Sequence, residues 1–393
     1  MRSAKLVDAG LLDSVRQRVL SEPGAVTPAR IAAAVQESGR LLGTAGTLAA
    51  VELITAELSG LGPLQSLAKD PEVTDIFVNG PRDVWYDGGQ GLERSAVEFA
   101  SEEAVRALAV RLVAAGGRRL DDSSPCVDVR LAGGYRVHAV LPPISAHGTL
   151  LSVRIRRERV FGLDELERLG TVLPEQREVL EAIVDRGISY LISGATGSGK
   201  TTLLSTLLGL SRPSERIVLV EDAAELNPDH GHVVGLEARH TNVEGSGSVD
   251  LADLVRQALR MRPDRLVVGE CRGAEVRELL AALNTGHSGA GTIHANSAES
   301  VGARLAALGA LAGLSPDATA LQAGSALGAV LHLDRASGGR RLRTIAVVDE
   351  QGSKLRIEPA LVRCPRTDQI EHGPGGSRLA DRLRGPSRRV AAA

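Results

Sequence analysis

A glycine-rich segment between an apolar run and a helical stretch constrains the fold of this chain more than any other feature. The segment reads GATGSGKTT over residues 194–202 and fits the pattern G-x-x-x-x-G-K-[ST]. It follows ISYLIS, which is typical of a buried strand, and it opens a stretch with helical spacing. A strand, this turn and a helix in succession predict a P-loop, the phosphate-binding element of many α/β domains.

The residue types in this segment suit a nucleoside triphosphate. Backbone N–H groups of the turn can surround a phosphate, and the helix N-terminus adds partial positive charge. Lys200 is expected to hold the β- and γ-phosphates of ATP, and the Thr201 hydroxyl to ligate Mg²⁺. The alternative is a glycine-rich turn without a ligand. The predicted nucleotide-binding residues are Gly194, Ala195, Thr196, Gly197, Ser198, Gly199, Lys200, Thr201 and Thr202.

From Leu173 onward, short apolar segments alternate with helical ones. RIVLVED and DRLVVGE read as two further buried strands, separated by helical stretches such as VDLADLVRQALRMRP. This alternation predicts a parallel sheet wrapped by helices, followed by a closing hairpin within residues 328–350. We therefore expect an α/β fold that carries the P-loop; on its own, a P-loop is compatible with a kinase, a GTPase, a helicase or a transporter.

The rest of the chain has a different character. The beginning is rich in Ala and Leu with helical spacing, for example Leu11, Leu12, Val15 and Val19 on one face. Short strands and one helix then predict a smaller α/β domain, and the end of the chain is rich in Gly, Pro and Arg. The expected organisation is a helical region over 1–60, an α/β domain over 61–157, a polar linker over 158–172, the domain with the P-loop over 173–364 and a disordered tail over 365–393.

Acidic residues end two of the predicted strands. Glu221 and Asp222 follow RIVLV, and Glu270 follows RLVVG. The carboxyl ends of parallel strands meet at one edge of a sheet, which is where such sheets bind ligands, so both acids should lie beside the P-loop. One carboxylate, Glu270, can hold the metal through water, while Glu221 orients or deprotonates the attacking water. Glu225 is a further candidate for the base, and a purely structural role for the acids is the alternative.

Two histidines, His287 and His294, lie seven residues apart in NTGHSGAGTIHANS. Taken alone they read as ordinary packing or surface residues. A metal pair is the alternative, although no third ligand is evident beside them.

Composition excludes several classes of protein. The formal net charge of −2 argues against a chain that coats nucleic acid, and no run of about 18 apolar residues is present. Three cysteines without metal-ligand spacing indicate a reducing, cytosolic compartment. The chain has no N-K-x-D motif, the guanine-reading element of GTPases.

Four segments together resemble a known family. GATGSGKTT, RIVLVEDAAEL, RMRPDRLVVGECRG and NTGHSGAGTIHANS are similar to the Walker A, aspartate-box, Walker B and histidine-box segments of the ATPases of type II and type IV secretion systems. The Walker B segment of that family ends in Gly-Glu, which matches Glu270. GLGPLQSLAKDPEVTDIFVNGP and the segment from Val127 to Arg157 resemble its N-terminal domain, so the likeness extends over about residues 58–350.

The resemblance implies more than the residues do alone. It implies that His287 and His294 are site residues, and that Arg130 and Arg136 reach the nucleotide from the N-terminal domain; surface arginines flanking a hairpin are the alternative. It also implies that residues 173–364 form a RecA-like P-loop ATPase domain, with ATP and Mg²⁺ as cofactors. It further implies a hexamer and a place on the cytoplasmic face of the membrane beside inner-membrane platform proteins. GLGPL and VTDIFVNG look most like the tight-adherence (Flp) pilus and conjugal-transfer branch.

The rival interpretation is a RecA-like helicase or nucleic-acid translocase. Such motors need a positive channel and often aromatic residues that stack on bases. One tryptophan, three tyrosines and three phenylalanines offer little stacking, so direct binding of nucleic acid is not expected. A scaffold that binds ATP without turnover is a third possibility, which Lys200, Glu221 and Glu270 argue against. The expected function is ATP hydrolysis that powers pilus assembly, secretion or conjugal transfer.

Overall fold

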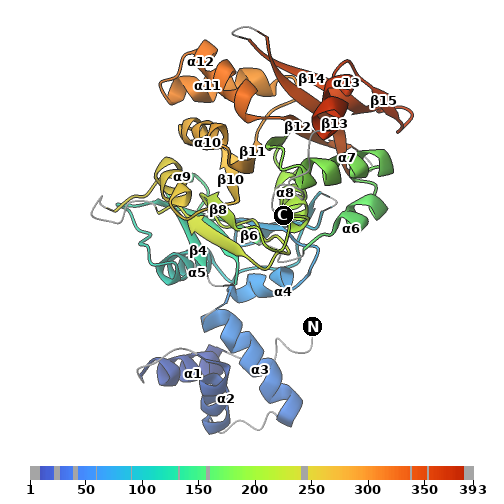
Figure 1. Cartoon of the computed structure of the whole chain (residues 1–393). Helices are drawn as coiled ribbons and strands as arrows, with labels where there is room; N and C mark the ends of the chain where they lie inside the picture. Colours follow the sequence, from blue (N-terminus) through green and yellow to red (C-terminus); the bar gives the residue numbers. More distant parts are fainter. Residues whose placement is uncertain are drawn as a thin grey trace. The chain divides into compact units, whose positions relative to one another are not determined.

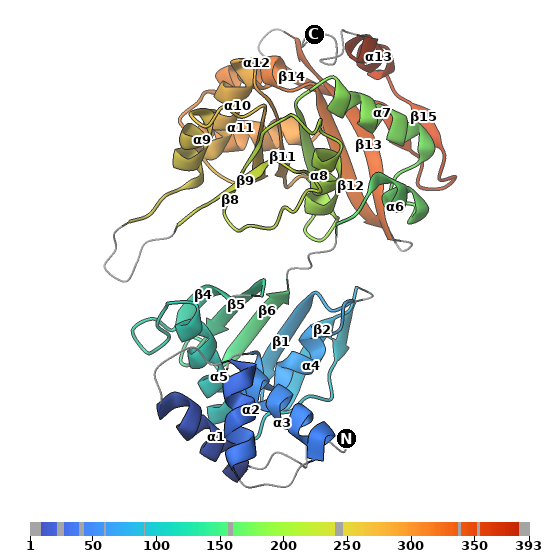
Figure 2. The same ribbon diagram turned by 60° about the horizontal axis from the view of Figure 1, so that its bottom comes forward.

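Figure 1 shows a computed structural model of the chain, and Figure 2 shows it turned. The structure describes residues 9–21, 27–38, 43–58, 60–89, 91–131, 133–155, 160–239, 247–336, 339–351 and 354–384. The chain divides into two compact units, Met1–Arg157 and Glu158–Ala393, and each is described by itself. Among the described helices, none is long and apolar enough to cross a membrane.

Three helices at the start of the first unit form a small bundle with its own core. They are α1 (Ala9–Ser21), α2 (Pro28–Glu37) and α3 (Gly43–Leu58). Leu11, Val15 and Val19 recur every four residues, so they share one face of α1, and all three are buried against α2 and α3. The side chain of Leu12, expected on the same face, lies outside the described residues.

A six-stranded antiparallel sheet forms the rest of the first unit. The strands have the order β3-β2-β1-β6-β5-β4. Alternate residues such as Leu151, Val153 and Ile155 face a core that they share with the helices of this unit. The helix expected among these strands is present over residues 102–115. The elements are η2 (Gly62–Leu64), α4 (Gln65–Ala68), β1 (Asp75–Gly80), β2 (Asp83–Asp87), β3 (Leu92–Arg94), α5 (Glu102–Ala115), β4 (Cys126–Leu131), β5 (Tyr135–Val140) and β6 (Leu150–Ile155).

The second unit contains a nine-stranded mixed sheet. Six strands are parallel, in the order β12-β7-β11-β10-β8-β9, and β13, β14 and β15 extend the sheet antiparallel beyond β12. The strands are β7 (Tyr190–Gly194), β8 (Ile217–Glu221), β9 (Val233–Glu237), β10 (Arg265–Cys271), β11 (Ser288–Ile293), β12 (Ala329–Ala336), β13 (Gly339–Gln351), β14 (Lys354–Arg363) and β15 (Ile370–His372). The predicted α/β class, parallel sheet and closing hairpin are confirmed.

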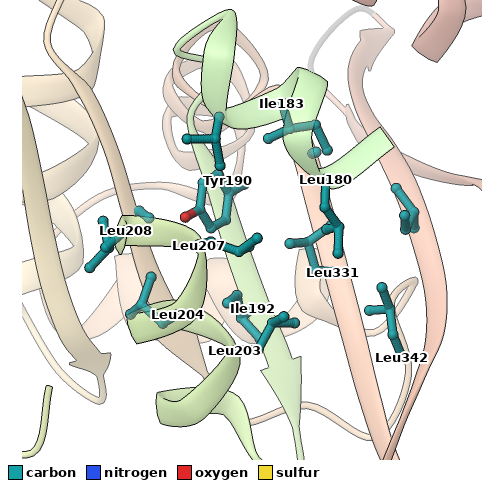
Figure 3. Packing of buried hydrophobic residues seen from close by; sticks show 14 of the residues in the cluster. Leu180, Ile183, Tyr190, Ile192, Leu203, Leu204, Leu207, Leu208, Leu331 and Leu342 are labelled. Carbon is teal, nitrogen blue, oxygen red and sulfur yellow. The ribbon is translucent and has the colours of Figure 1, made fainter. Parts of the chain in front are cut away.

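Helices cover both faces of this sheet. Tyr190 and Ile192 of β7 face one buried cluster, and Leu191 between them faces the other, because successive side chains of a strand point to opposite faces. Figure 3 shows leucines of α8 packed against Tyr190 and Ile192. The helices on that face are α6 (Leu163–Arg168), α7 (Pro174–Asp185), α8 (Lys200–Gly209) and α13 (Gly376–Arg384). Those on the other face are α9 (Leu251–Leu259), α10 (Glu275–Asn284), α11 (Val301–Leu311) and α12 (Pro316–Ala326).

The predicted linker over residues 158–172 is wrong for most of its length. Residues 163–168 form α6, and Leu163, Leu166 and Val172 are buried in the core of the second unit. The segment looked like a linker because its polar residues outnumber its apolar ones. Two leucines three residues apart are nevertheless enough to give a short helix one buried face. Residues 158 and 159 lie outside the described residues.

The predicted disordered tail over residues 365–393 is wrong in its described part. Strand β15 pairs with β14, and Leu379 of α13 is buried against the sheet. The guanidinium of Arg363, itself buried, donates to both carboxylate oxygens of Asp368, at 2.8 and 2.7 Å, and so holds the turn between β14 and β15. Composition concealed this order because a few well-placed residues supply it. Residues 385–393 lie outside the described residues.

Candidate active site

The P-loop joins the end of β7 to the beginning of α8. Gly194, Gly197 and Gly199 have φ values of 151, 74 and 97°, a backbone region that residues other than glycine rarely adopt. A Cβ on Gly194 would also collide with the carbonyl oxygen of Leu333 and with Ser198 Oγ. The glycines therefore fix a turn whose N–H groups can point toward one phosphate, ahead of the N-terminus of α8.

Lys200 is held within the P-loop itself. Its Nζ donates to the carbonyl oxygens of Ala195, at 2.9 Å, and Gly194, at 3.1 Å. Burial lowers the pKa of the Lys200 ammonium; the charge of Arg272 lowers it further, while the carboxylates of Glu270 and Glu225 oppose the shift. A partly buried ammonium beside a phosphate-sized turn is placed to bind anionic oxygens.

Three side chains from neighbouring strands meet beside Lys200. Glu270 lies near the carboxyl end of β10, and His294 follows the end of β11 directly. His294 Nε2 lies 2.5 Å from Glu270 Oε1, and Arg272 Nη2 donates to Glu270 Oε2 at 2.5 Å. The other ring nitrogen of His294, Nδ1, lies 3.4 Å from Lys200 Nζ. The imidazole therefore connects the P-loop lysine to the strand-end carboxylate.

The two groups beside His294 determine which ring nitrogen carries the proton in the neutral imidazole. Burial lowers its pKa, and the charge of Lys200 adds to this effect, while Glu270 opposes it. Since Nδ1 faces an ammonium, it acts as the acceptor, and the proton is assigned to Nε2, toward Glu270.

Glu221 ends β8, as expected, but its carboxylate is occupied. The side chain is 5% exposed, and Oε1 accepts the backbone N–H groups of Glu225, at 2.8 Å, and Leu226, at 2.9 Å. Glu221 therefore shapes the segment that follows β8. Glu225 lies at the end of that segment with its side chain exposed. Its negative charge acts to raise the pKa of both Lys200 and Arg272. Of these two carboxylates, Glu225 is the one accessible to water.

The expectation that both histidines belong to the site is wrong for His287. His287 precedes the first residue of β11 and His294 follows the last, so they lie at opposite edges of the sheet. At about 3.3 Å per residue, seven residues of strand separate them by roughly 20 Å. His287 Nδ1 lies 3.0 Å from Thr285 Oγ1, in the turn that ends α10.

The residues named for magnesium fit a water-mediated ion. Mg²⁺ in phosphate sites is usually held by one or two side chains, phosphate oxygens and water. The described part of the chain contains no cluster of three or more His, Cys, Asp or Glu side chains that could hold a metal. Glu270 Oε1 is buried with His294 Nε2 2.5 Å from it, so a metal-bound water would share this carboxylate with the imidazole. Thr201 is the second residue of α8, directly after Lys200 of the P-loop.

Sequence reasoning missed an arginine that contacts the P-loop from a distant hairpin. Arg340 of β13 donates from Nε to the carbonyl oxygen of Gly197 at 3.1 Å, across 143 residues of sequence. A Cβ on Gly199 would lie 3.0 Å from Arg340 Cδ. Nothing local in the sequence marks Arg340, because only the pairing of β12 with both β7 and β13 brings it there.

The first unit carries a row of arginines that sequence reasoning found only in part. Arg130 of β4 pairs in register with Arg136 of β5, and Arg136 pairs with Arg154 of β6. The three side chains share the face opposite the buried one, and Arg154 Nε lies 3.1 Å from Asp75 Oδ1. Two carboxylates lie against this row, since Asp128 Oδ1 is also 3.8 Å from Arg136 Nε, so the three guanidinium groups share their surroundings with acidic side chains. Arg154 could have been noticed from the alternation SVRI, but not its register.

Comparison with known proteins places the chain in a family. The model of the family described as "Type II/IV secretion system protein" matches residues 57–366. A "Putative conjugal transfer protein" of Mycobacterium tuberculosis (strain H37Rv) is 49% identical over 324 residues, which cover 80% of this chain and 92% of that protein. The type IV secretion system protein PtlH of Bordetella pertussis is 35% identical over 253 residues, covering 58% of this chain and 74% of that one.

Solved structures agree on the fold. The ATPase DotB of Legionella pneumophila has a TM-score of 0.53 at 22% identity and covers 72% of this chain and 79% of its own. The pilus retraction motor PilT, solved with bound ADP, has a TM-score of 0.52 at 22% identity, with 75% and 82% covered. With the P-loop, Glu270 and His294 assembled at the carboxyl edge of its sheet, the chain belongs to the type II/IV secretion system protein family of P-loop ATPases.

Proposed function

We propose that the protein hydrolyses Mg²⁺-bound ATP and works as a hexameric motor for a membrane-spanning transfer complex. The observation that carries the catalytic part is the convergence of Lys200, Glu270 and His294 from three different strand ends beside one P-loop. A glycine-rich turn without a ligand would not require a partly buried lysine in contact with a histidine that in turn contacts a carboxylate.

The chemistry follows from these positions. P-loop N–H groups and Lys200 bind the phosphates, while Thr201 and, through water, Glu270 would hold Mg²⁺, which neutralises charge on the β- and γ-phosphates. A water molecule attacks the γ-phosphorus, the bond between that phosphorus and the ADP oxygen breaks, and the water proton passes to a carboxylate. We assign this proton to Glu225, because Glu221 is buried and accepts two backbone N–H groups.

Positive charge beyond Lys200 is assigned to the row of Arg130, Arg136 and Arg154. An arginine that meets the γ-phosphate only during turnover stabilises the transition state and contributes on the order of 10³–10⁵ in rate. Three guanidinium groups that lie in register on one face of a sheet support this role, because arginine binds phosphate oxygens in a bidentate arrangement.

The branch of the family is inferred from the relatives. The Mycobacterium tuberculosis relative carries a conjugal-transfer name, and PtlH is a type IV secretion system protein. We place this protein in the conjugal-transfer and tight-adherence pilus branch, on the cytoplasmic face of the membrane and against inner-membrane platform proteins. The nucleic-acid motor remains the rival, because an oligomeric P-loop ATPase could also act on DNA.

Phosphate release by the purified full-length protein tests the proposal. Lys200→Ala is expected to lose turnover by about 10²-fold or more, because the side chain that matches phosphate charge is gone. Lys354→Ala, an exposed lysine on β14 of the same unit, is the matched control and should keep the wild-type rate. Turnover by a folded Lys200→Ala variant at the wild-type rate would remove the site. Stimulation by single-stranded DNA, rather than by membrane partners, would favour the rival motor.

A further inference from the structure

A cavity of about 350 Å³ opens at the edge of the sheet opposite the P-loop. Its walls come from the residues before β7, the beginning of β11 and the residues before β12, three parallel strands whose amino ends meet there. Arg382 of α13 completes the lining. The cavity therefore lies apart from the candidate active site, with the whole length of the strands between them.

Arg382 differs from the other arginines of its helix. Arg378 forms ion pairs with Glu358 and Asp349, and Arg384 pairs with Asp381 at 2.9 Å. Arg382 instead donates from Nη1 to two backbone carbonyl oxygens, those of Gly328 at 3.1 Å and Leu327 at 3.3 Å. Within the described ranges no carboxylate comes within ion-pair distance of Arg382. A cation held by neutral carbonyls keeps its charge available for a ligand.

The backbone makes room for this guanidinium. A Cβ on Gly328 would come within 3.2 Å of Arg382 Nη1 and would collide with Ile188 Cγ2. Burial lowers the pKa of Arg382, and the charge of Asp349 opposes that shift, although Asp349 is itself bound to Arg378 at 3.4 Å. The fold therefore partly buries this cation without placing any carboxylate of the described ranges within ion-pair distance of it, which is energetically unfavourable.

The rest of the lining suits an anion. His287 contributes an imidazole, and no acidic side chain is among the residues that line the cavity. Ser189 contributes a hydroxyl whose oxygen accepts the N–H of Gly289, whereas the Ser288 hydroxyl donates to the carbonyl oxygen of Gly187. The guanidinium fork of arginine matches the oxygens of a phosphate in a bidentate arrangement. Helix α13 also lies outside residues 57–366, so the arginine comes from a part of the chain that the family model does not match.

We propose that this cavity binds a phosphate group, held by Arg382 and His287, as part of a small phosphate ester or of a lipid headgroup. The cavity volume exceeds that of inorganic phosphate, which leaves room for the remainder of such a molecule. The proposal does not depend on which cargo the motor moves.

The test follows the His287 ring by ¹H–¹³C NMR in the full-length protein, with the P-loop first saturated by a non-hydrolysable ATP analogue and Mg²⁺. Inorganic phosphate is the probe, and a saturable shift of the His287 signals is expected. Arg382→Gln should weaken the apparent affinity about 10-fold or more, because a charge-assisted bidentate contact is lost. Arg384→Gln, the same substitution two residues along the same helix, should leave the affinity unchanged.

A second variant protects the test against misfolding. Arg382→Lys keeps the charge without the fork, so it should bind phosphate more weakly than the wild type and more tightly than Arg382→Gln. Flotation with phosphatidic acid vesicles, compared with neutral phosphatidylcholine vesicles, distinguishes the sources: binding lost in Arg382→Gln assigns the site to a lipid headgroup, and phosphate binding without flotation assigns it to a soluble ester. A His287 signal that does not respond to phosphate, together with flotation indifferent to Arg382, would overturn the proposal.

Discussion

The distinct roles assigned to Glu221 and Glu225 give a sharp prediction about stability and turnover. Glu221→Ala removes the acceptor of two backbone N–H groups, one of them buried in the fold. A buried donor left unsatisfied costs about 1–3 kcal/mol, and the second donor can partly recover by binding water, so the free energy of unfolding should fall by roughly 2–4 kcal/mol. Glu221→Gln keeps an oxygen in place and should cost only about 1 kcal/mol, because neutral acceptors bind less strongly than charged ones.

Thermal unfolding and phosphate release measure the two effects separately. In a domain of this size, each kcal/mol shifts Tm by about 2–4 °C, so Glu221→Ala should lower Tm by roughly 4–16 °C and Glu221→Gln by about 2–4 °C. Glu225→Gln should leave Tm unchanged, since the side chain is exposed, and should lower kcat by about 10²–10⁴. Glu175→Gln, an exposed glutamate in α7, is the matched control for both measurements.

Two outcomes would refute this reasoning. A Glu221→Gln variant that keeps its Tm and binds ATP, yet turns over at least 100-fold more slowly than the wild type, would make Glu221 the base and its backbone contacts incidental. A Glu225→Gln variant with wild-type kcat would remove Glu225 from the mechanism. Because Tm and kcat are expected to move in different variants, loss of folding cannot be mistaken for loss of chemistry.

Further predictions concern the arginines and pH. Arg136→Ala should bind ATP almost normally yet hydrolyse it on the order of 10³ more slowly, and Arg130→Ala should show a smaller loss; full-rate hydrolysis by both, with binding measured separately, would exclude the arginine row. Arg340→Ala should raise KM for ATP a few-fold with kcat little changed, because Arg340 braces Gly197 from outside the phosphate-binding turn; an unchanged KM would contradict this. Burial lowers the pKa of His332 below its usual 6.5, so the unfolded chain takes up a proton at higher pH than the folded one, and the free energy of unfolding should fall as pH drops below about 6.5. His332→Gln should lose part of that slope in denaturant titrations between about pH 5 and pH 8, and equal slopes in the two proteins would disprove the assignment.

The parts of the site that sequence could predict are those fixed by local spacing. GATGSGKTT specifies its own turn, and an acid at the end of a parallel strand must lie at the carboxyl edge. What the Glu221 carboxylate contacts could not be predicted, because its hydrogen bonds depend on the backbone path of the residues after β8. Arg340 and Arg154 were missed for a related reason: each is placed by pairing between strands far apart in sequence.

The errors have equally specific causes. His287 and His294 read as a pair because they share one segment, whereas the strand between them separates them to opposite edges. Composition suggested a linker and a disordered tail, but Leu166 and Leu379 each anchor a short helix to the core. Average polarity over a window conceals such anchors.

Strand β11 has a consequence for how the protein tolerates mutation. All six of its residues are buried, and it lies between β7 and β10 in the sheet. A Cβ on Gly289 would collide with the carbonyl oxygen of Leu266, and one on Gly291 would come within 3.0 Å of the carbonyl oxygen of Val268. In a saturation scan scored on activity, Gly289 is expected to be as intolerant of substitution as Lys200 and Gly291 less so, although both lie in the strand before His294 and not in the P-loop. Positions that a genetic screen would report as functional are here required by steric exclusion between backbones.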